Sequence, residues 1–111
     1  MITAKDLQDL FSFKTDSREI VSVFLELDGP QSYRRNFKAL LEGPAAKEIA
    51  LQGFQQDLDR IALHVNEELE PGRHRGLALF SARRRNFWQA CLLPEPVNTR
   101  VCLGARHHRR T

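Results

Sequence analysis

The chain has 111 residues, which corresponds to one compact domain and leaves no room for a second. Hydrophobic residues make up 41% of it and charged residues 28%, so the composition is globular and excludes a disordered chain. The apolar run at 77–80 is far shorter than the roughly 20 residues of a membrane span, and the N-terminal sequence does not resemble a signal peptide. A cytoplasmic location without a membrane partner is therefore expected.

The spacing of apolar residues predicts three elements in the first part of the chain. Helical spacing behind a start that resembles a capping box predicts a helix over 3–13. Alternation over 20–28 predicts a strand, one face of which carries Val21, Val23, Leu25 and Leu27. Helical spacing over 33–41 predicts a short helix, which Gly43 and Pro44 end.

The second part of the chain is predicted to hold one long helix and three strands. Apolar side chains keep to one face over 45–69, which predicts the longest helix, with a bend at Gly53. An almost wholly apolar run at 76–82 predicts a central strand covered on both faces. A basic four-residue loop leads into a second run at 87–93, which predicts a hairpin, and a short edge strand is predicted at 101–103.

This order of elements predicts a single domain of the α/β or α+β class. We expect a small mixed β-sheet of three to four strands with helices packed against it. If the strands at 20–28 and 76–82 are parallel neighbours, the crossover that joins them is expected to be right-handed.

The net charge of +3 conceals two segments of opposite charge. Counting Lys and Arg against Asp and Glu, residues 1–70 carry 8 − 13 = −5 and residues 71–111 carry 9 − 1 = +8. All nine cations of the second segment are arginines. A segment of this kind favours an anionic partner, with nucleic acid as the leading candidate.

The histidine and cysteine residues do not have the sequence spacing that is typical of a metal site or of a catalytic nucleophile. His107 and His108 are adjacent and point in different directions, so they are not expected to form a metal site with Cys102. Cys91 is expected to be a small core residue of its strand, not a reactive thiol. No glycine-rich phosphate loop occurs in the sequence, and neither a metal ion nor a cofactor is expected.

Side chains for acid–base catalysis are equally unconvincing. Asp57 and Asp59 lie two positions apart on the predicted helix, so they cannot face each other, and both are expected on its solvated face. His64 lies beside the apolar stripe of that helix and is expected to have a structural role. The chain is therefore expected not to be an enzyme.

The arginines remain as candidates for a functional site. The residues expected to bind nucleic acid flank the strand at 76–82 or close the chain, and they are Arg73, Arg75, Arg83, Arg84, Arg85, Arg106, Arg109 and Arg110. Arginine presents a planar, permanently charged group that matches phosphate oxygens. The alternative is that 83–85 is a solvated turn that protects the sheet from aggregation. Phe87 and Trp88 are expected to pack in the core, and stacking on bases is the alternative for them.

Four segments taken together resemble a known family, namely IVSVFLELDGP, QQDLDRIALHVNEELE, GRHRGLALFSA and NFWQACLLPEPVNTRVCLG. The chain resembles the N-terminal domain of bacterial proteins related to the archaeal and eukaryotic class-1 peptide-chain release factors. The resemblance extends from about Ile2 to His108, and its most telling parts are GLALF after a P-G turn and the following L-P-x-P-V.

The resemblance implies a role in translation. In the family, a following domain with a glycine-rich G-G-Q loop promotes hydrolysis of peptidyl-tRNA in the ribosome, and no such loop occurs in this chain. The segment EGPAAKEIA at 42–50 falls where the family has its T-A-S-N-I-K-S decoding loop and does not match it. Of the Y-x-C-x-x-x-F stop-codon motif, Cys102 within RVCLGARHH is the one matching residue. Ribosome rescue or hibernation therefore fits as well as termination.

The sequence predicts a module that binds the ribosome or structured RNA and carries no catalysis itself. The alternative is a protein-interaction or structural domain whose basic end docks on an acidic partner or on a second domain. If a second domain is missing, the face that it normally covers is expected to promote association of the chain.

Overall fold

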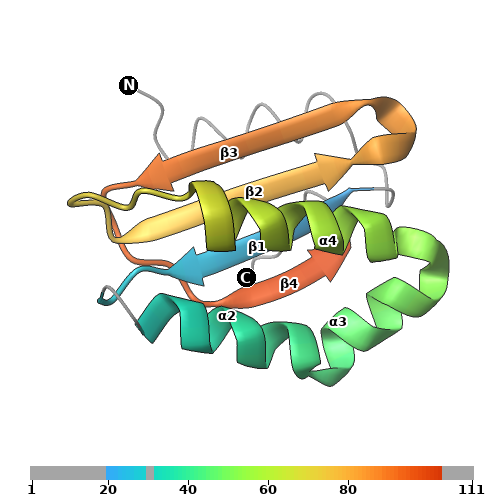
Figure 1. The fold of residues 1–111 in the computed structure, drawn as a ribbon, viewed down its shortest axis with the longest axis horizontal. Helices are drawn as coiled ribbons and strands as arrows, with labels where there is room; N and C mark the ends of the chain where they lie inside the picture. The colour runs from blue at the N-terminus through green and yellow to red at the C-terminus, as the bar shows by residue number, and fades with distance from the viewer. Residues whose placement is uncertain (1–19, 30–31, 104–111) are drawn as a thin grey trace, which may run out of the picture.

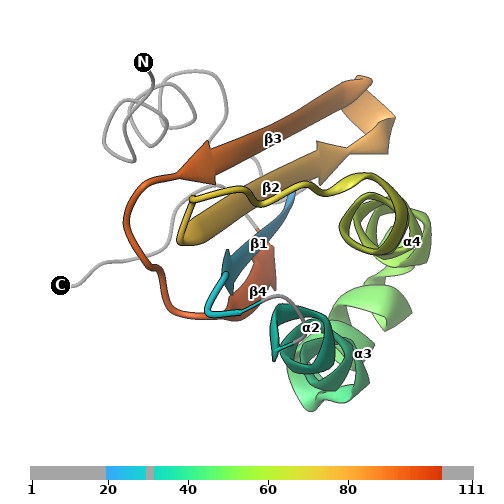
Figure 2. The ribbon, with the colours of Figure 1, turned by 60° about the vertical axis from the view of Figure 1, so that its left-hand side comes forward.

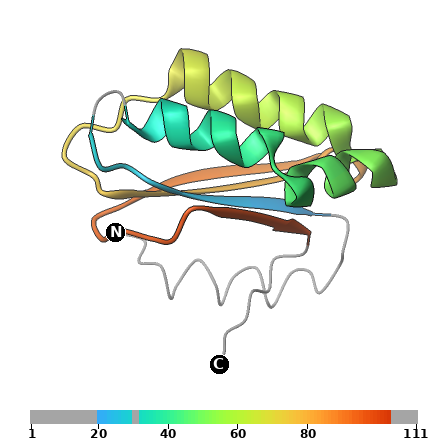
Figure 3. The ribbon, with the colours of Figure 1, turned by 90° about the horizontal axis from the view of Figure 1, so that it is seen from below.

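The computed structural model describes residues 20–29 and 32–103. One four-stranded sheet and a layer of helices make up this part of the chain (Figure 1). Figure 3 shows that the helices lie together on one side of the sheet. The predicted fold class of strands with helices packed against them is confirmed, whereas the helix predicted at 3–13 lies outside the described residues.

All the strands predicted from the sequence are present, and their pairing is antiparallel throughout. They are β1 (Val21–Glu26), β2 (Gly76–Ala82), β3 (Phe87–Leu93) and β4 (Arg100–Leu103). Their order across the sheet is β3-β2-β1-β4, so the predicted edge strand pairs with β1. Because β1 and β2 are antiparallel, the handedness rule for parallel crossovers does not apply to them.

The helical layer begins with α2 (Ser32–Glu42), which has the three turns predicted for it. Two helical runs follow α2 along the chain. The first run is α3 (Pro44–Ile49) with the π-helical turn η1 (Ala50–Phe54), and the second is α4 (Gln55–Leu63) with η2 (His64–Glu68). The sequence predicted one bent helix here, and that continuity is wrong. The backbone leaves helical geometry at Gly53, and the chain changes direction between α3 and α4 (Figure 1).

The main core fills the space between the sheet and the helices. Alternate residues of β1 and β2 point toward the helices, and the register places Val23 beside Leu79 and Leu25 beside Leu77. Helix side chains close this core from above, and they include Tyr33, Phe37, Ile49, Phe54, Leu58, Ile61 and Val65. The face of β1 predicted to be apolar, Val21, Val23, Leu25 and Leu27, is confirmed as part of it.

The opposite face of the sheet carries a second buried cluster, made of Ile20, Phe24, Ala78, Phe80, Ala82 and Leu93. The prediction that β2 is covered on both faces is therefore confirmed, since all seven of its residues are buried. On this face the ring of Phe24 meets that of Phe80 edge-on, with 5.7 Å between the ring centroids.

The sheet gives the molecule two ends that matter for the site. The β2–β3 turn lies at one end, which we call the turn end (Figures 1 and 2). The loop of residues 69–75 and the start of α2 lie at the other, which we call the loop end. Seven residues of β2 separate the two ends, a distance of roughly 23 Å at about 3.3 Å per residue.

Candidate nucleic-acid interface

The β2–β3 turn presents three consecutive arginines to solvent. Arg83, Arg84 and Arg85 form a single 3₁₀ turn, η3, and all three are exposed. The turn closes when the backbone N–H of Asn86 donates to the carbonyl of Arg83 over 3.1 Å. Asn86 adopts left-handed geometry (φ 55°), which asparagine tolerates better than most residues do. The basic loop predicted from the sequence is thus a compact turn.

Asp57 fixes this turn to helix α4. One oxygen of its carboxylate, Oδ1, accepts a hydrogen bond from the Ser81 hydroxyl at 2.7 Å and another from the backbone N–H of Arg83 at 2.9 Å. The side chain is 4% exposed, so the expected position on the solvated face is wrong for Asp57. Its companion Asp59 is exposed as expected and accepts a hydrogen bond from Gln55.

Two aromatic rings hold arginine side chains at the turn end. The guanidinium of Arg84 lies over the ring of Phe54, 4.7 Å from its centroid. The guanidinium of Arg60, on α4, lies over the ring of Trp88 at the same distance. Contacts of this kind restrict where an arginine head can go while leaving its N–H groups able to donate.

Trp88 and Phe87 serve the packing of the sheet. Trp88 packs against the main core, where His64 meets its ring edge-on, and Phe87 packs against the second cluster. The expectation of core packing is confirmed, and base stacking is not needed to explain either ring. His64 also lies 3.1 Å from Glu68, one turn further along, in keeping with the structural role expected for it.

Together these residues form a basic surface at the turn end, which consists of the exposed Arg83, Arg84 and Arg85 and the half-buried Arg60. Arg83, Arg84 and Arg85 were predicted from the sequence, whereas Arg60 was not, because it comes from the acidic part of the chain. Asp57 was also misplaced, although a signal was present. It lies three residues after Phe54 and four before Ile61, the spacing of residues on one face of a helix, and both of these are buried.

The other predicted arginines do not join this surface. Arg73 and Arg75 are exposed in the segment that leads into β2, at the loop end. The backbone of Arg75 extends the sheet, because its N–H donates to Leu93 and its carbonyl accepts from Leu27. Arg106, Arg109 and Arg110 lie outside the described residues.

The two cysteines lie on different edge strands of the sheet, separated by β1 and β2. Three strand spacings are about 14 Å, too far for a disulfide. Burial raises the pKa of the Cys91 thiol, and it also raises the pKa of Cys102 against an opposing effect of Arg100. Both thiols therefore stay protonated at neutral pH, which lowers their reactivity.

Within residues 20–29 and 32–103, no three His, Cys, Asp or Glu side chains come close enough together to hold a metal ion. The histidines at 107 and 108 lie outside this part. None of the described helices has the length and apolar character needed to cross a membrane.

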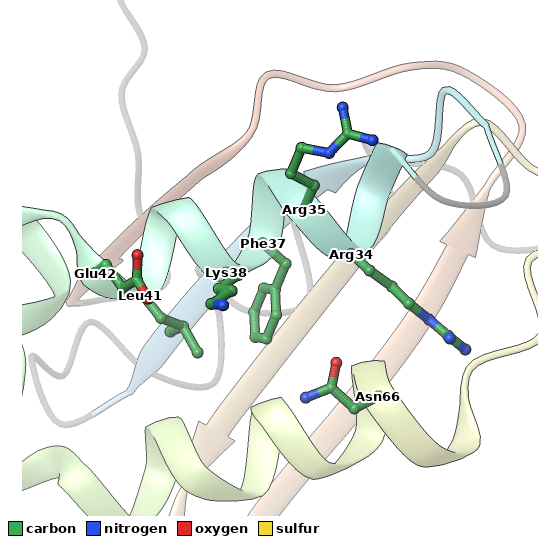
Figure 4. A pocket seen from close by; sticks show the side chains of 7 residues that line it. All are labelled: Arg34, Arg35, Phe37, Lys38, Leu41, Glu42 and Asn66. Carbon is green, nitrogen blue, oxygen red and sulfur yellow. The ribbon is translucent and has the colours of Figure 1, made fainter.

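A second basic region lies on the outer side of the helical layer, between α2 and the end of the α4–η2 run (Figure 4). It is a groove of about 580 Å³, lined by Arg34, Arg35, Phe37, Lys38, Leu41, Glu42 and Asn66. This groove was not predicted from the sequence, because its cations belong to the segment with a net negative charge and Asn66 comes from a different helix.

Comparison of the chain with models of protein families, with curated proteins and with solved structures gives no match. The candidate interface therefore depends on its own geometry and charge.

Proposed function

We propose that this chain is an RNA-binding module that engages structured RNA, such as that of the ribosome, through the basic surface at its turn end. The observation that carries the proposal is the exposed turn Arg83–Arg85, fixed to helix α4 by the buried carboxylate of Asp57. No catalytic step is assigned to these residues.

Rigidity is the first argument for an RNA partner. A flexible arginine loses conformational freedom when it binds a phosphate, and that cost weakens binding. Here the backbone of Arg83 is bound by Asp57, and the head of Arg84 is placed over Phe54 before any ligand arrives. Four arginine heads on one end of a small domain suit a row of phosphates more than a single small anion.

The burial of Asp57 is the second argument. Its carboxylate is turned inward, where Oδ1 accepts hydrogen bonds from the Ser81 hydroxyl and from the backbone N–H of Arg83. It therefore stabilises the turn without offering its oxygens to the arginine heads outside. Asp57 therefore does not neutralise the charge of the turn's arginine heads.

Two charge-matched double variants test the proposal. Arg84→Ala with Arg85→Ala removes two exposed arginines at the turn end, and Arg73→Ala with Arg75→Ala removes two at the loop end. We expect the first pair to weaken binding of a fluorescent RNA hairpin and of purified ribosomes by about tenfold or more, and the second pair to have a much smaller effect.

Equal losses from the two pairs, or no binding by the unaltered chain, would contradict the proposal. A polyglutamate competitor at matched ionic strength separates RNA recognition from docking on an acidic protein. If it displaces the RNA as effectively as unlabelled RNA does, the protein-interaction alternative is favoured instead.

A further inference from the structure

The groove between α2 and η2 is lined by charged residues of α2 whose positions do not stabilise that helix. Arg34 and Arg35 lie in the first turn of α2, which has no acidic residue, and Glu42 ends the helix, whose last turn has no basic one. This order is the reverse of what the helix dipole favours at both ends. The helix forms nevertheless, because Tyr33 and Phe37 are buried in the main core.

The cations of the groove are not neutralised by neighbouring carboxylates. Within the described residues, His64–Glu68 is the one pair within ion-pair distance, and neither of its members lines the groove. The guanidinium of Arg34 lies over the ring of its own neighbour Tyr33, 5.7 Å from the centroid. Lys38 and Glu42 are one turn apart on α2 and still do not form an ion pair.

Figure 4 shows how the polar side chains lie. Arg34 extends toward the side of the groove where Asn66 projects from η2, and Arg35 points away from Asn66. Lys38 follows Arg34 by four residues, so the two lie on the same face of α2. The groove therefore offers two cations and an amide from two different helices, above an apolar floor made by Phe37 and Leu41.

We propose that this groove binds a small phosphorylated metabolite that carries hydroxyl groups, such as a sugar phosphate. Arg34 and Lys38 bind the phosphate, and Asn66 donates to one of its oxygens. Along the axis of α2, Glu42 lies about 12 Å from Arg34 and about 6 Å from Lys38, where its carboxylate accepts hydrogen bonds from hydroxyl groups and repels a second anionic group. The groove is of the size of ordinary small-ligand sites.

The test is a titration of the whole chain followed by amide NMR, with inorganic phosphate in one arm and ribose 5-phosphate in the other. Chloride keeps the ionic strength constant. We expect saturable shifts confined to α2 and to the region of Asn66, with tighter binding of ribose 5-phosphate than of phosphate alone. Arg34→Gln and Lys38→Gln should each weaken that binding by about tenfold.

Lys47→Gln is the matched control, because it removes one exposed positive charge from helix α3, outside the groove. It should leave the affinity within about twofold of the original. Shifts that grow without saturation, or an equal loss in Lys47→Gln, would show general screening and overturn the proposal. A loss of RNA affinity in Arg34→Gln as large as that of the Arg84 and Arg85 pair would also overturn the proposal, since the groove would then be part of the RNA interface.

The titration with phosphate and ribose 5-phosphate contains no RNA. If the groove does not bind these ligands, the proposed function of the turn end is therefore unaffected.

Discussion

At the scale of single residues, Asp57 shows how one buried carboxylate connects packing to function. It joins the first turn of α4 to the end of β2 through Ser81 and to the turn through the backbone of Arg83. A negative charge near the start of a helix also interacts favourably with the helix dipole. The same side chain therefore helps to stabilise α4 and to hold the basic turn.

Replacing Asp57 with alanine should lower the free energy of unfolding by about 2 to 3 kcal/mol, because the Ser81 hydroxyl and the Arg83 N–H lose a charged acceptor in a buried place. Urea denaturation followed by circular dichroism measures this. Asp59→Ala on the same helix is the control and should change stability by no more than about 0.5 kcal/mol, since Asp59 is exposed. Equal effects of the two substitutions would show that the Asp57 hydrogen bonds contribute little.

The lining of the groove between α2 and η2 could not be predicted from the sequence. Arg34 and Asn66 are 32 positions apart, and nothing in their local sequence shows that they line one cavity. The same applies to Arg60 and Trp88, which are brought together by the packing of α4 on β3. Contacts between distant residues depend on the fold, and charge counts over segments do not reveal them.

At the scale of elements, the strands were predictable and the helix break was not fully so. The strands could be predicted from their alternating apolar residues and from the P-G and basic turns beside them. A strand with a buried face tolerates no shift of register by one residue, so its apolar pattern must match the sheet. The segment 45–69 keeps its apolar face across Gly53, so periodicity alone predicts one helix. The φ of +100° at Gly53 lies in a region that other residues avoid, and it ends the first helical run there.

Gly53→Ala should destabilise the protein by about 1 to 2 kcal/mol, because alanine is strained at this backbone geometry. The added Cβ would also lie 3.0 Å from Nη2 of Arg84, so this head would have to shift slightly over the ring of Phe54. Gly72→Ala is the matched control, with a φ of +58° and open space around the added carbon. Chemical denaturation should show a larger loss for Gly53→Ala, and an equal or smaller loss would mean that the contact with Arg84 is unimportant.

At the scale of the whole molecule, the sequence correctly suggested one sheet with helices packed on it, and it located the arginines near the ends of the central strand. It did not distinguish the two ends. Arg73 and Arg75 lie at one end of β2 and Arg83–Arg85 at the other, so the basic segment of the chain does not make one basic surface. The net charge of +3 is the sum of an acidic segment and a basic segment, and the arginines of the basic segment lie at both ends of β2.

The proposed function requires the arginines of the turn end to contact several phosphates of an RNA. The most direct test is the dependence of RNA affinity on salt for the unaltered chain and for the variant in which Arg83, Arg84 and Arg85 are alanine. The logarithm of the affinity should fall linearly with the logarithm of the salt concentration. In the triple variant the slope should be shallower by about 2 to 3, since each phosphate contact contributes roughly 0.7 to 0.9. The same slope in both proteins would contradict the proposed phosphate contacts of the turn.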